Sequence, residues 1–282
     1  MALFGKKNSG NNEDNHTAPI DEQEQRPKNR VRDNSKGIGQ FAGFVLLSEN
    51  EWSKEKFLAD LKADWGINIP LQEDEEKELL YADAEGFRIV VSLMPYPVPN
   101  GEAEHFAKAN YMWRDAEKVV AGHKAQILVC ILGDNPDIMA KGRLFVKIAC
   151  CALKQEKALA LYSEGAVYEP RMFIDCSRMI KDYTLPIMNL VWFGLYGDGK
   201  QAGVYTYGMR RFGREEIEVY VDANKADLEE LRAFVLNIAV YVLDSGVTLR
   251  DGETIGFSAE QKLPITVSPG IAVSGNTVKI TL

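Results

Sequence analysis

The order of apolar patterns along residues 43–132 constrains the fold of this chain more than any other feature. Gly43 to Glu49 is a short apolar run bounded by turn residues. The segment after it carries apolar positions at helical spacing, and we predict that Ser53 caps this helix and Gly66 ends it. Two more strand-like runs meet at a glycine-containing turn, a helical segment follows, and Ala125 to Leu132 is continuously apolar. The predicted order is β-α-β-β-α-β, which indicates a ferredoxin-like arrangement.

Residues 134–282 predict a second, similar α+β unit. A helix, a strand and another helix come first, and three antiparallel strands follow. Asn224 is predicted to cap a long helix, after which we predict short strands around ETIGFS, LPITV, GIAVS and TVKITL. We therefore predict an α+β protein built from antiparallel or mixed sheets covered by helices. Two sandwiches in contact and one continuous sheet both satisfy this order. The likeness of VLLSENEW to ALYSEGAVY also leaves an old duplication open.

Three regions are predicted along the chain. Residues 1–39 are polar and nearly lack large apolar side chains, so we expect a disordered leader that cannot offset its ordering entropy. Residues 40–133 form the ferredoxin-like half. Residues 134–282 form the second α+β half, which ends in short strands.

Charge and cysteine usage narrow the compartment and the partners. The net charge of −8 disfavours nonspecific binding to nucleic acid and to anionic lipid, both of which need a basic surface. No apolar stretch approaches the roughly 20 residues of a membrane span, and the first residues do not resemble a signal peptide. The four cysteines stand in apolar contexts that suit reduced thiols. These features predict a cytoplasmic protein without nucleic acid, membrane, metal or cofactor.

The first candidate site is a proline-punctuated bend before the helix predicted over residues 102–121. Three prolines stiffen the backbone around Tyr96, and Glu102 and His105 follow at the helix start. A carboxylate beside an imidazole can tune it for acid–base chemistry, or supply two of the ligands that a metal needs. The plainer interpretation is that acidic residues favour a helix N-terminus. Trp113, farther along the same predicted helix, is included as a candidate binding residue.

The second candidate is His123, in the turn that ends that helix. A histidine there can bind exposed helix carbonyls, and partners for a metal role are not apparent.

The third candidate is the strand surface that carries Tyr205, Tyr207 and Arg211. Their period-two spacing places them on one face, and tyrosine and arginine are enriched at interface hot spots. Packing of the tyrosines on a helix is the alternative. On the next strand, Glu216 and Glu218 alternate with apolar residues, which indicates either an acid–base pair or an exposed polar face.

Two segments carry a family resemblance. One is MPYPVPNGEAEHFAKANYMWRDAEKVVAGHKAQILVCIL, with its spaced prolines, acidic helix opening, tryptophan and Gly-His-Lys-Ala run; the other is the C-terminal GETIGFSAEQKLPITVSPGIAVSGNTVKITL. Both resemble bacterial proteins grouped as domain of unknown function 4261, over roughly residues 43–282. Members of that family often have a second histidine where this chain has Gln126. The resemblance implies an intracellular bacterial protein of undetermined activity and carries over no catalytic residue.

Motifs that usually carry chemistry are missing from the sequence. The chain has three histidines and no phosphate-binding loop, nucleophile elbow or HExxH. We therefore expect a non-enzymatic module that binds an unknown protein partner, or a second copy, through an exposed sheet face or the proline-rich bend. The alternative is an enzyme or small-ligand-binding protein with a pocket of carboxylate, tyrosine and histidine side chains between the two halves.

Overall fold

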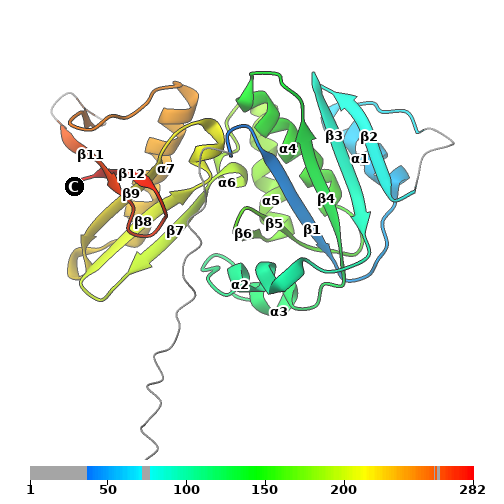
Figure 1. Ribbon diagram of the computed structural model, residues 1–282, viewed down its shortest axis with the longest axis horizontal. Helices are drawn as coiled ribbons and strands as arrows, with labels where there is room; N and C mark the ends of the chain where they lie inside the picture. The colour runs from blue at the N-terminus through cyan, green and yellow to red at the C-terminus, as the bar shows by residue number, and fades with distance from the viewer. Residues whose placement is uncertain (1–36, 72–76, 257, 259–260) are drawn as a thin grey trace, which may run out of the picture. The chain divides into compact units, whose positions relative to one another are not determined.

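The computed structural model describes residues 37–71, 77–256, 258 and 261–282, which contain two six-stranded sheets (Figure 1). The first sheet has the order β2-β3-β4-β1-β5-β6, and all its neighbouring strands are antiparallel. Its strands are β1 (Phe41–Leu47), β2 (Leu79–Ala84), β3 (Phe87–Met94), β4 (Ala125–Leu132), β5 (Ala158–Ser163) and β6 (Ala166–Tyr168). Apart from residues 37–39, the predicted leader lies outside the described residues.

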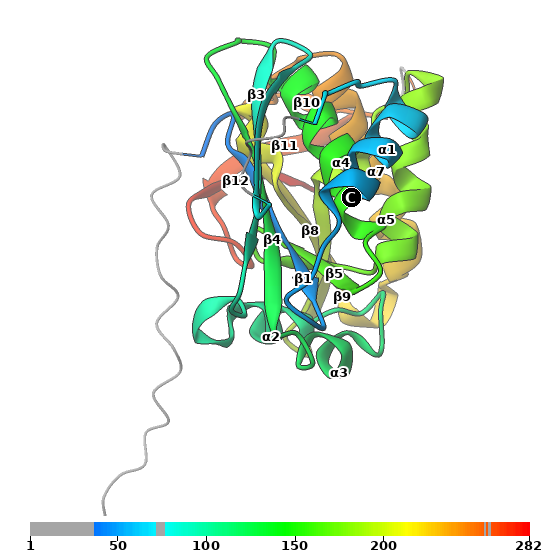
Figure 2. The ribbon, with the colours of Figure 1, turned by 90° about the vertical axis from the view of Figure 1, so that its right-hand side faces the viewer.

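Three helices, α1 (Lys54–Trp65), α4 (Ile138–Leu153) and α5 (Pro170–Ser177), lie on one side of the first sheet (Figure 2). As predicted, the Ser53 hydroxyl caps α1 by accepting the Lys56 N–H, and Gly66 ends it at a φ of 68°. Two short helices, α2 (Glu102–Ala107) and α3 (Ala116–Val120), lie at one end of the sheet (Figure 1). They cover a small apolar cluster on its other side, which includes Leu46, Ala160 and Tyr162.

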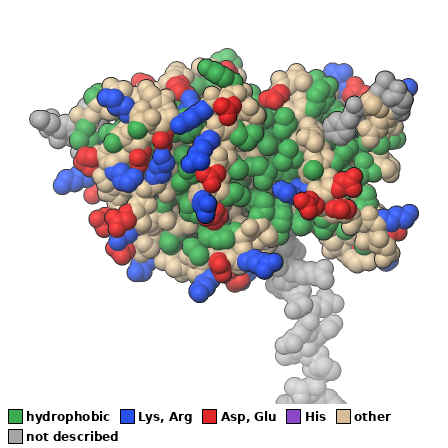
Figure 3. Space-filling view, turned by 180° about the vertical axis from the view of Figure 1, so that it is seen from behind, with side chains coloured by type: hydrophobic (Ala, Val, Ile, Leu, Met, Phe, Trp, Pro, Cys, Tyr) green, Lys and Arg blue, Asp and Glu red, His purple; other side chains and the backbone are tan. Residues whose placement is uncertain are grey.

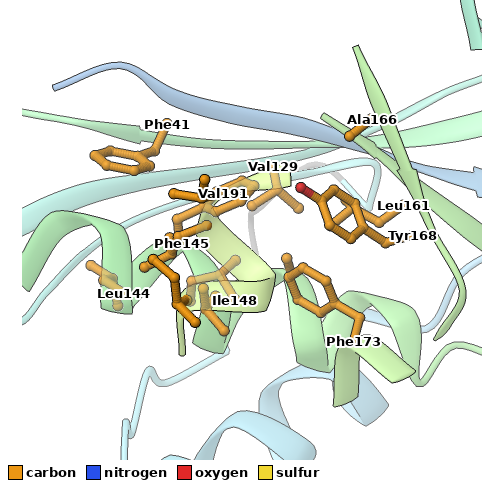
Figure 4. Close-up of a cluster of buried hydrophobic side chains, with 14 of the residues drawn as sticks. Phe41, Val129, Leu144, Phe145, Ile148, Leu161, Ala166, Tyr168, Phe173 and Val191 are labelled. Carbon is orange, nitrogen blue, oxygen red and sulfur yellow. The ribbon is translucent and has the colours of Figure 1, made fainter. Parts of the chain in front are cut away.

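The main core lies between the first sheet and α4. Figure 4 shows side chains of β1, β4 and β5 pointing toward Leu144, Phe145 and Ile148 of α4. Gly142 allows this approach, because a Cβ there would lie 3.1 Å from the Phe41 ring and 3.3 Å from Phe212. The same buried cluster continues into the second sheet, so one core serves both sheets.

The second sheet has the order β10-β11-β12-β9-β8-β7, and β12 and β9 are its one parallel pair among the described strands. The long helix α7 (Leu228–Asp244) packs its buried residues, among them Leu231, Val235 and Ile238, against this sheet. The strands are β7 (Trp192–Gly197), β8 (Gln201–Tyr207), β9 (Glu216–Asp222), β10 (Thr254–Ile255), β11 (Leu263–Pro269) and β12 (Asn276–Ile280). The predicted class, α+β with antiparallel and mixed sheets, is confirmed.

The shorter elements connect these layers. η2 (Pro99–Gly101) precedes α2, and η3 (Arg178–Asp182) and α6 (Ile187–Leu190) lead from α5 to β7. In the second half, η4 (Met209–Phe212) follows β8 and η5 (Ala223–Lys225) follows β9.

Strand order differs from the ferredoxin-like prediction, which is not confirmed. β3 pairs with β4, and β4 rather than β3 pairs with β1. β4, α4 and β5 form a split β-α-β unit around β1, so β5 and β6 belong to the first sheet although they follow residue 134. β1 and β5, which carry the two similar sequence segments, are neighbours in this one sheet.

Three local predictions are wrong for identifiable reasons. Asp227 rather than Asn224 caps α7, because its carboxylate accepts the N–H groups of Glu229 and Glu230. The predicted strand GIAVS is a loop that folds onto a buried carboxylate described below. The helix predicted over residues 102–121 is broken between α2 and α3, where Asn110 redirects the chain.

Candidate functional site

The structure separates the eight candidate residues into distinct places. His123 is buried, whereas Tyr96 of the proline bend and Glu102 and His105 of α2 are exposed. The tyrosine pair lies on β8, and Arg211 lies beyond the end of that strand. The candidates are Tyr96, Glu102, His105, Trp113, His123, Tyr205, Tyr207 and Arg211.

His123 is a structural histidine whose two ring nitrogens are both engaged. Nε2 accepts the Val98 N–H at 3.0 Å, and Nδ1 donates to the Val120 carbonyl at 2.6 Å. The ring is therefore the neutral tautomer that carries its proton on Nδ1, with Glu104 Oε1 3.5 Å away. It fastens the proline bend to the end of α3. Neither nitrogen has a lone pair or proton left for a substrate.

The candidate side chains of the proline bend and of the start of α2 lie at the surface. Tyr96 is 51% exposed, and Glu102 and His105 are also exposed. The His105 ring contacts Phe106 edge-on. Among the described residues, no group of three or more His, Cys, Asp or Glu side chains is placed to hold a metal ion.

The segment between α2 and α3, residues 108–115, connects the edges of the two sheets, and we call it the bridging loop. The Asn110 amide nitrogen donates to the Val167 carbonyl of β6 at 2.8 Å, and its oxygen accepts the N–H groups of Met112 and Trp113. The Tyr111 hydroxyl donates to the Phe193 carbonyl of β7 at 2.6 Å. One loop thus covers an edge strand of each sheet.

A pocket of about 230 Å³ lies where the bridging loop meets β6 and α5. Its wall combines an indole ring, two thioethers and one carboxylate, from Asn110, Met112, Trp113, Val167, Glu169 and Met172. Glu169 Oε2 accepts the Met172 N–H at 2.7 Å and so caps α5. Of the sequence candidates only Trp113 is here. An asparagine in the middle of a predicted helix was the available signal for the loop, because its side chain competes for backbone N–H groups.

The two tyrosines of β8 project from the same face of the second sheet, as predicted. The Tyr205 ring lies over Gly194 of β7, where a Cβ would come within 2.1 Å of it. Tyr220 of β9 lies in the same way over Gly203. Burial raises the pKa of the Tyr205 phenol above its ordinary value of 10, and the nearby Tyr207 raises it further. Both β8 tyrosines remain partly accessible.

Arg211 does not share that face, because β8 ends at Tyr207 and the chain turns at Gly208, with a φ of 125°, into η4. The Arg211 side chain is 4% exposed; Nη2 donates to the Leu190 carbonyl at 2.6 Å, and Nε lies 3.2 Å from Glu164 Oε2. Its guanidinium also lies 5.3 Å from the centre of the Phe41 ring. Arg211 is therefore a tie between the sheets and not an exposed hot spot.

The carboxylates of β9 are buried, so the predicted exposed polar face is wrong. Glu218 has no exposure and accepts the N–H groups of Ile271, Ala272 and Val273 and the Thr277 hydroxyl. Glu216, 2% exposed, accepts the Thr206 hydroxyl and the N–H groups of residues 208–210. Each carboxylate folds a separate segment onto the sheet, and the two do not share a ligand site.

The side of the first sheet opposite α4 carries a cluster of apolar residues that we call the open face. Asp83, Arg88 and Ser92 lie among them on the same side, and the Arg88 guanidinium lies 5.1 Å from the centre of the Tyr81 ring. Cross-strand pairing joins Tyr81 to Val90, Val90 to Cys130 and Cys130 to Ala42. Tyr81 is 53% and Leu132 44% exposed, and the other apolar residues of this face are half-buried. No helix of the described residues crosses this part of the sheet, which faces the viewer in Figure 1. The open face comprises Ala42, Leu79, Tyr81, Val90, Leu128, Cys130 and Leu132.

The opposite side of the molecule also carries apolar surface. Figure 3 shows hydrophobic side chains gathered in the middle of that side, with charged side chains toward its margins. Tyr183, 96% exposed at the end of η3, and Tyr241, 48% exposed on α7, are large hydrophobic residues outside the open face. The described part of the chain contains no helix with the length and apolarity of a membrane span.

The fold defines an α+β protein of two sheets whose edges the bridging loop connects. Comparison with known families matches residues 205–281 to the family described as Domain of unknown function (DUF4261). The predicted resemblance is thus confirmed over residues 205–281, from the end of β8 through β12, whereas the segment Met94–Leu132 lies outside the matched range. No curated protein and no solved structure matches the chain.

Proposed function

We propose that this chain is a cytoplasmic, non-enzymatic protein-interaction module that binds an amphipathic helix of a partner protein on the open face. The observation that carries the proposal is the uncovered, contiguous set of half-exposed apolar residues on one face of an antiparallel sheet. Antiparallel sheets that face water usually alternate apolar and polar residues, so that their solvent side is polar. Exposed contiguous apolar patches of this kind mark interaction sites.

The sequence of β4 supports the proposal, because its apolar pattern is typical of a strand that is buried on both faces of a sheet. AQILVCIL is apolar at nearly every position, which is the pattern of a strand buried on both faces. Its core-side residues Ile127, Val129 and Ile131 are covered by the main core, whereas Leu128 and Cys130 stay half-buried. A partner on the open face completes the burial that this pattern requires.

The packing of α4 on the opposite side of the first sheet favours a helix as the partner that binds the open face. α4 packs across β1, β4 and β5 on that side, and the open face offers a comparable apolar surface of the same sheet. Residues 1–36 are a poorer occupant, because their large apolar residues are few and scattered: Met1, Leu3, Phe4, Ile20 and Val31. Self-association is disfavoured at long range by the net charge of −8 on each copy.

The enzymatic alternative has less support. It needs acid–base groups in a cleft, but both nitrogens of His123 bind backbone groups and His105 is exposed. The carboxylates of β9 are each enclosed by backbone N–H groups.

A matched pair of double variants tests the proposal. Tyr81→Ser with Leu132→Ser removes the two most exposed apolar side chains of the open face. Tyr241→Ser with Ile271→Ser removes a tyrosine of α7 and an aliphatic residue of the loop after β11, whose exposures of 48% and 50% are similar. Partners are recovered with the full chain by native mass spectrometry, identified, purified and titrated by calorimetry. We expect the open-face variant to raise the Kd for the partner at least about tenfold, because it removes one or two buried hot spots. The control variant should leave the Kd unchanged.

Alkylation of Cys130 gives an independent readout on the open face. Burial raises the pKa of this thiol, so iodoacetamide labelling is measured at pH 8.5 with and without the purified partner. Protection by the partner supports the proposal. Binding that the control variant weakens, while the open-face variant and Cys130 labelling stay unaffected, would place the interface at α7 or the loop after β11 and overturn the proposal. A homodimer that forms through the open face would show that a second copy of the chain, rather than a helix of another protein, binds there, and would contradict the proposal.

A further inference from the structure

The pocket beside the bridging loop has the chemistry of a site for one organic cation. We propose that it binds a single alkylguanidinium or alkylammonium group, such as the side chain of an arginine or lysine. The proposal rests on the six residues of the pocket wall and does not depend on a partner at the open face.

Size limits the ligand first. A volume of about 230 Å³ lies below the roughly 300–1,000 Å³ of pockets that hold drug-sized molecules or cofactors. It suits a group of the size of one side chain. Nucleotides and other extended cofactors do not fit such a space.

The polar groups of the pocket wall then determine which charge the ligand carries. Asn110 uses its amide oxygen and nitrogen within the protein, for the bridging loop and for β6. Glu169 uses one carboxylate oxygen for the Met172 N–H, and none of the described basic side chains pairs with its charge. An anion would be repelled by this carboxylate, and a neutral apolar group would bury it without compensation. A cation compensates it.

The remaining wall suits the stem and the charge of such a group. Trp113 supplies an indole ring, the best aromatic partner of a cation, and the thioethers of Met112 and Met172 adapt to an alkyl chain. The pocket is also rigidly framed. Asn110 fixes the loop on β6, Tyr111 fixes it on β7, and Glu169 itself caps α5. An ordered frame of this kind lowers the entropy cost of binding.

The test uses the full chain, with its four tryptophan indoles labelled by ¹⁵N. Ethylguanidinium chloride is titrated in, with N-ethylurea as an uncharged probe of similar shape, and Trp113→Phe assigns the indole signal. We expect a saturable shift of the Trp113 signal with a Kd on the order of millimolar, as for a ligand of few atoms, and a response to N-ethylurea at least about tenfold weaker.

Glu169→Gln isolates the charge, because its amide oxygen still accepts the Met172 N–H. We expect it to weaken ethylguanidinium binding at least about tenfold, whereas the control Asp175→Asn, on the same helix, leaves it unchanged. Equal binding of the urea, or an unaffected Glu169→Gln variant, would overturn the cation site. So would a saturable shift confined to other tryptophans.

The source of the cation is decided by one more titration. Acetyl-Gly-Arg-Gly-amide presents the same group from a peptide backbone. Tighter binding of this peptide than of ethylguanidinium supports a side chain of a partner protein. Weaker binding supports a free small cation. Failure of the open-face variants to affect a partner would leave these titrations unchanged, so the two proposals fail separately.

Discussion

The two sheets are stabilised by different means. The first sheet packs apolar side chains on α4. Its buried polar side chains make individual hydrogen bonds, such as the one that Ser163 donates to the Ala42 carbonyl. The second sheet buries two carboxylates and stacks tyrosine rings on glycines. Alternating acidic residues on a strand therefore need not face water. Neighbouring backbone N–H groups can enclose them, as the loop after β11 encloses Glu218.

The largest expected effect is at Glu218. Glu218→Ala leaves three backbone N–H groups and the Thr277 hydroxyl without their acceptor, and it removes the carboxylate that lies 3.6 Å from the Lys279 ammonium. We expect a loss of about 3–5 kcal/mol in the free energy of unfolding, as for breaking a buried charged network. Ser163→Ala, at 4% exposure in the first sheet, should cost only about 1 kcal/mol. Urea unfolding monitored by circular dichroism measures both. Equal losses would contradict the distinction between the sheets.

Glycine substitutions sharpen the same contrast. A Cβ at Gly203 would lie 2.5 Å from the Val219 carbonyl oxygen and 2.4 Å from the Tyr220 ring, and the backbone atom cannot move aside. A Cβ at Gly43 of the first sheet would meet only side chains, at 3.1–3.3 Å. We expect Gly203→Ala to cost about 3 kcal/mol and Gly43→Ala about 1 kcal/mol, within the range for overpacking. Thermal unfolding of the two variants compares them, and a larger loss for Gly43→Ala would refute this account.

Much of the fold was predictable because local signals decide it. Ser53 and Gly66 bound α1 as expected, and the hairpin at Gly86 follows from its sequence. Strand order was not predictable, because the pairing of β1 with β4 and β5 depends on contacts between residues distant in sequence. The sequence of β9 correctly predicted that acidic and apolar side chains alternate between its two faces. It could not predict that the acidic face is buried, because the 270–275 loop, which is distant in sequence, covers Glu218.

The candidate site was less predictable than the fold. Trp113 was selected, but its pocket neighbours Met112, Glu169 and Met172 come from two segments that only the folded chain brings together. His123 was selected for its chemistry, and its role is a structural one set by two backbone groups. Arg211 does not lie on the face of the two tyrosines, because the chain turns after β8. Glu216 stabilises this turn by accepting the N–H groups of residues 208–210.

The pH dependence of stability is the third prediction. Burial raises the pKa of Glu216 above its ordinary value of 4.5, and this effect exceeds the opposing one of its hydrogen bonds. A raised folded-state pKa stabilises the protein fully below pH 4.5, and the stabilisation is lost as the pH rises through the folded-state pKa. The stability of the wild type relative to Glu216→Gln should therefore fall as the pH rises from 4.5. Urea titrations at several pH values measure this difference.

Asp198, an exposed turn residue, provides the control of opposite sign. Backbone N–H groups of Gln201 and Lys200 lower its pKa below 3.8, so its contribution is present above that pH and lost as the pH falls. The wild type should therefore lose stability relative to Asp198→Asn on acidification. A difference between the wild type and Glu216→Gln that is independent of pH would show that Glu216 folds without a raised pKa.

The smallest expected effect is at the bridge between the sheets. Tyr111→Phe removes the hydrogen bond to the Phe193 carbonyl but keeps the ring, which contacts Trp192 edge-on. We expect a loss of about 1 kcal/mol, as for one hydrogen bond, and no change for Tyr241→Phe on α7. Hydrogen exchange should quicken in the bridging loop and at the edge strand β7 more than in β3 or β4. An unchanged exchange pattern would mean that packing alone, rather than the Tyr111 hydroxyl, holds the edges of the two sheets together.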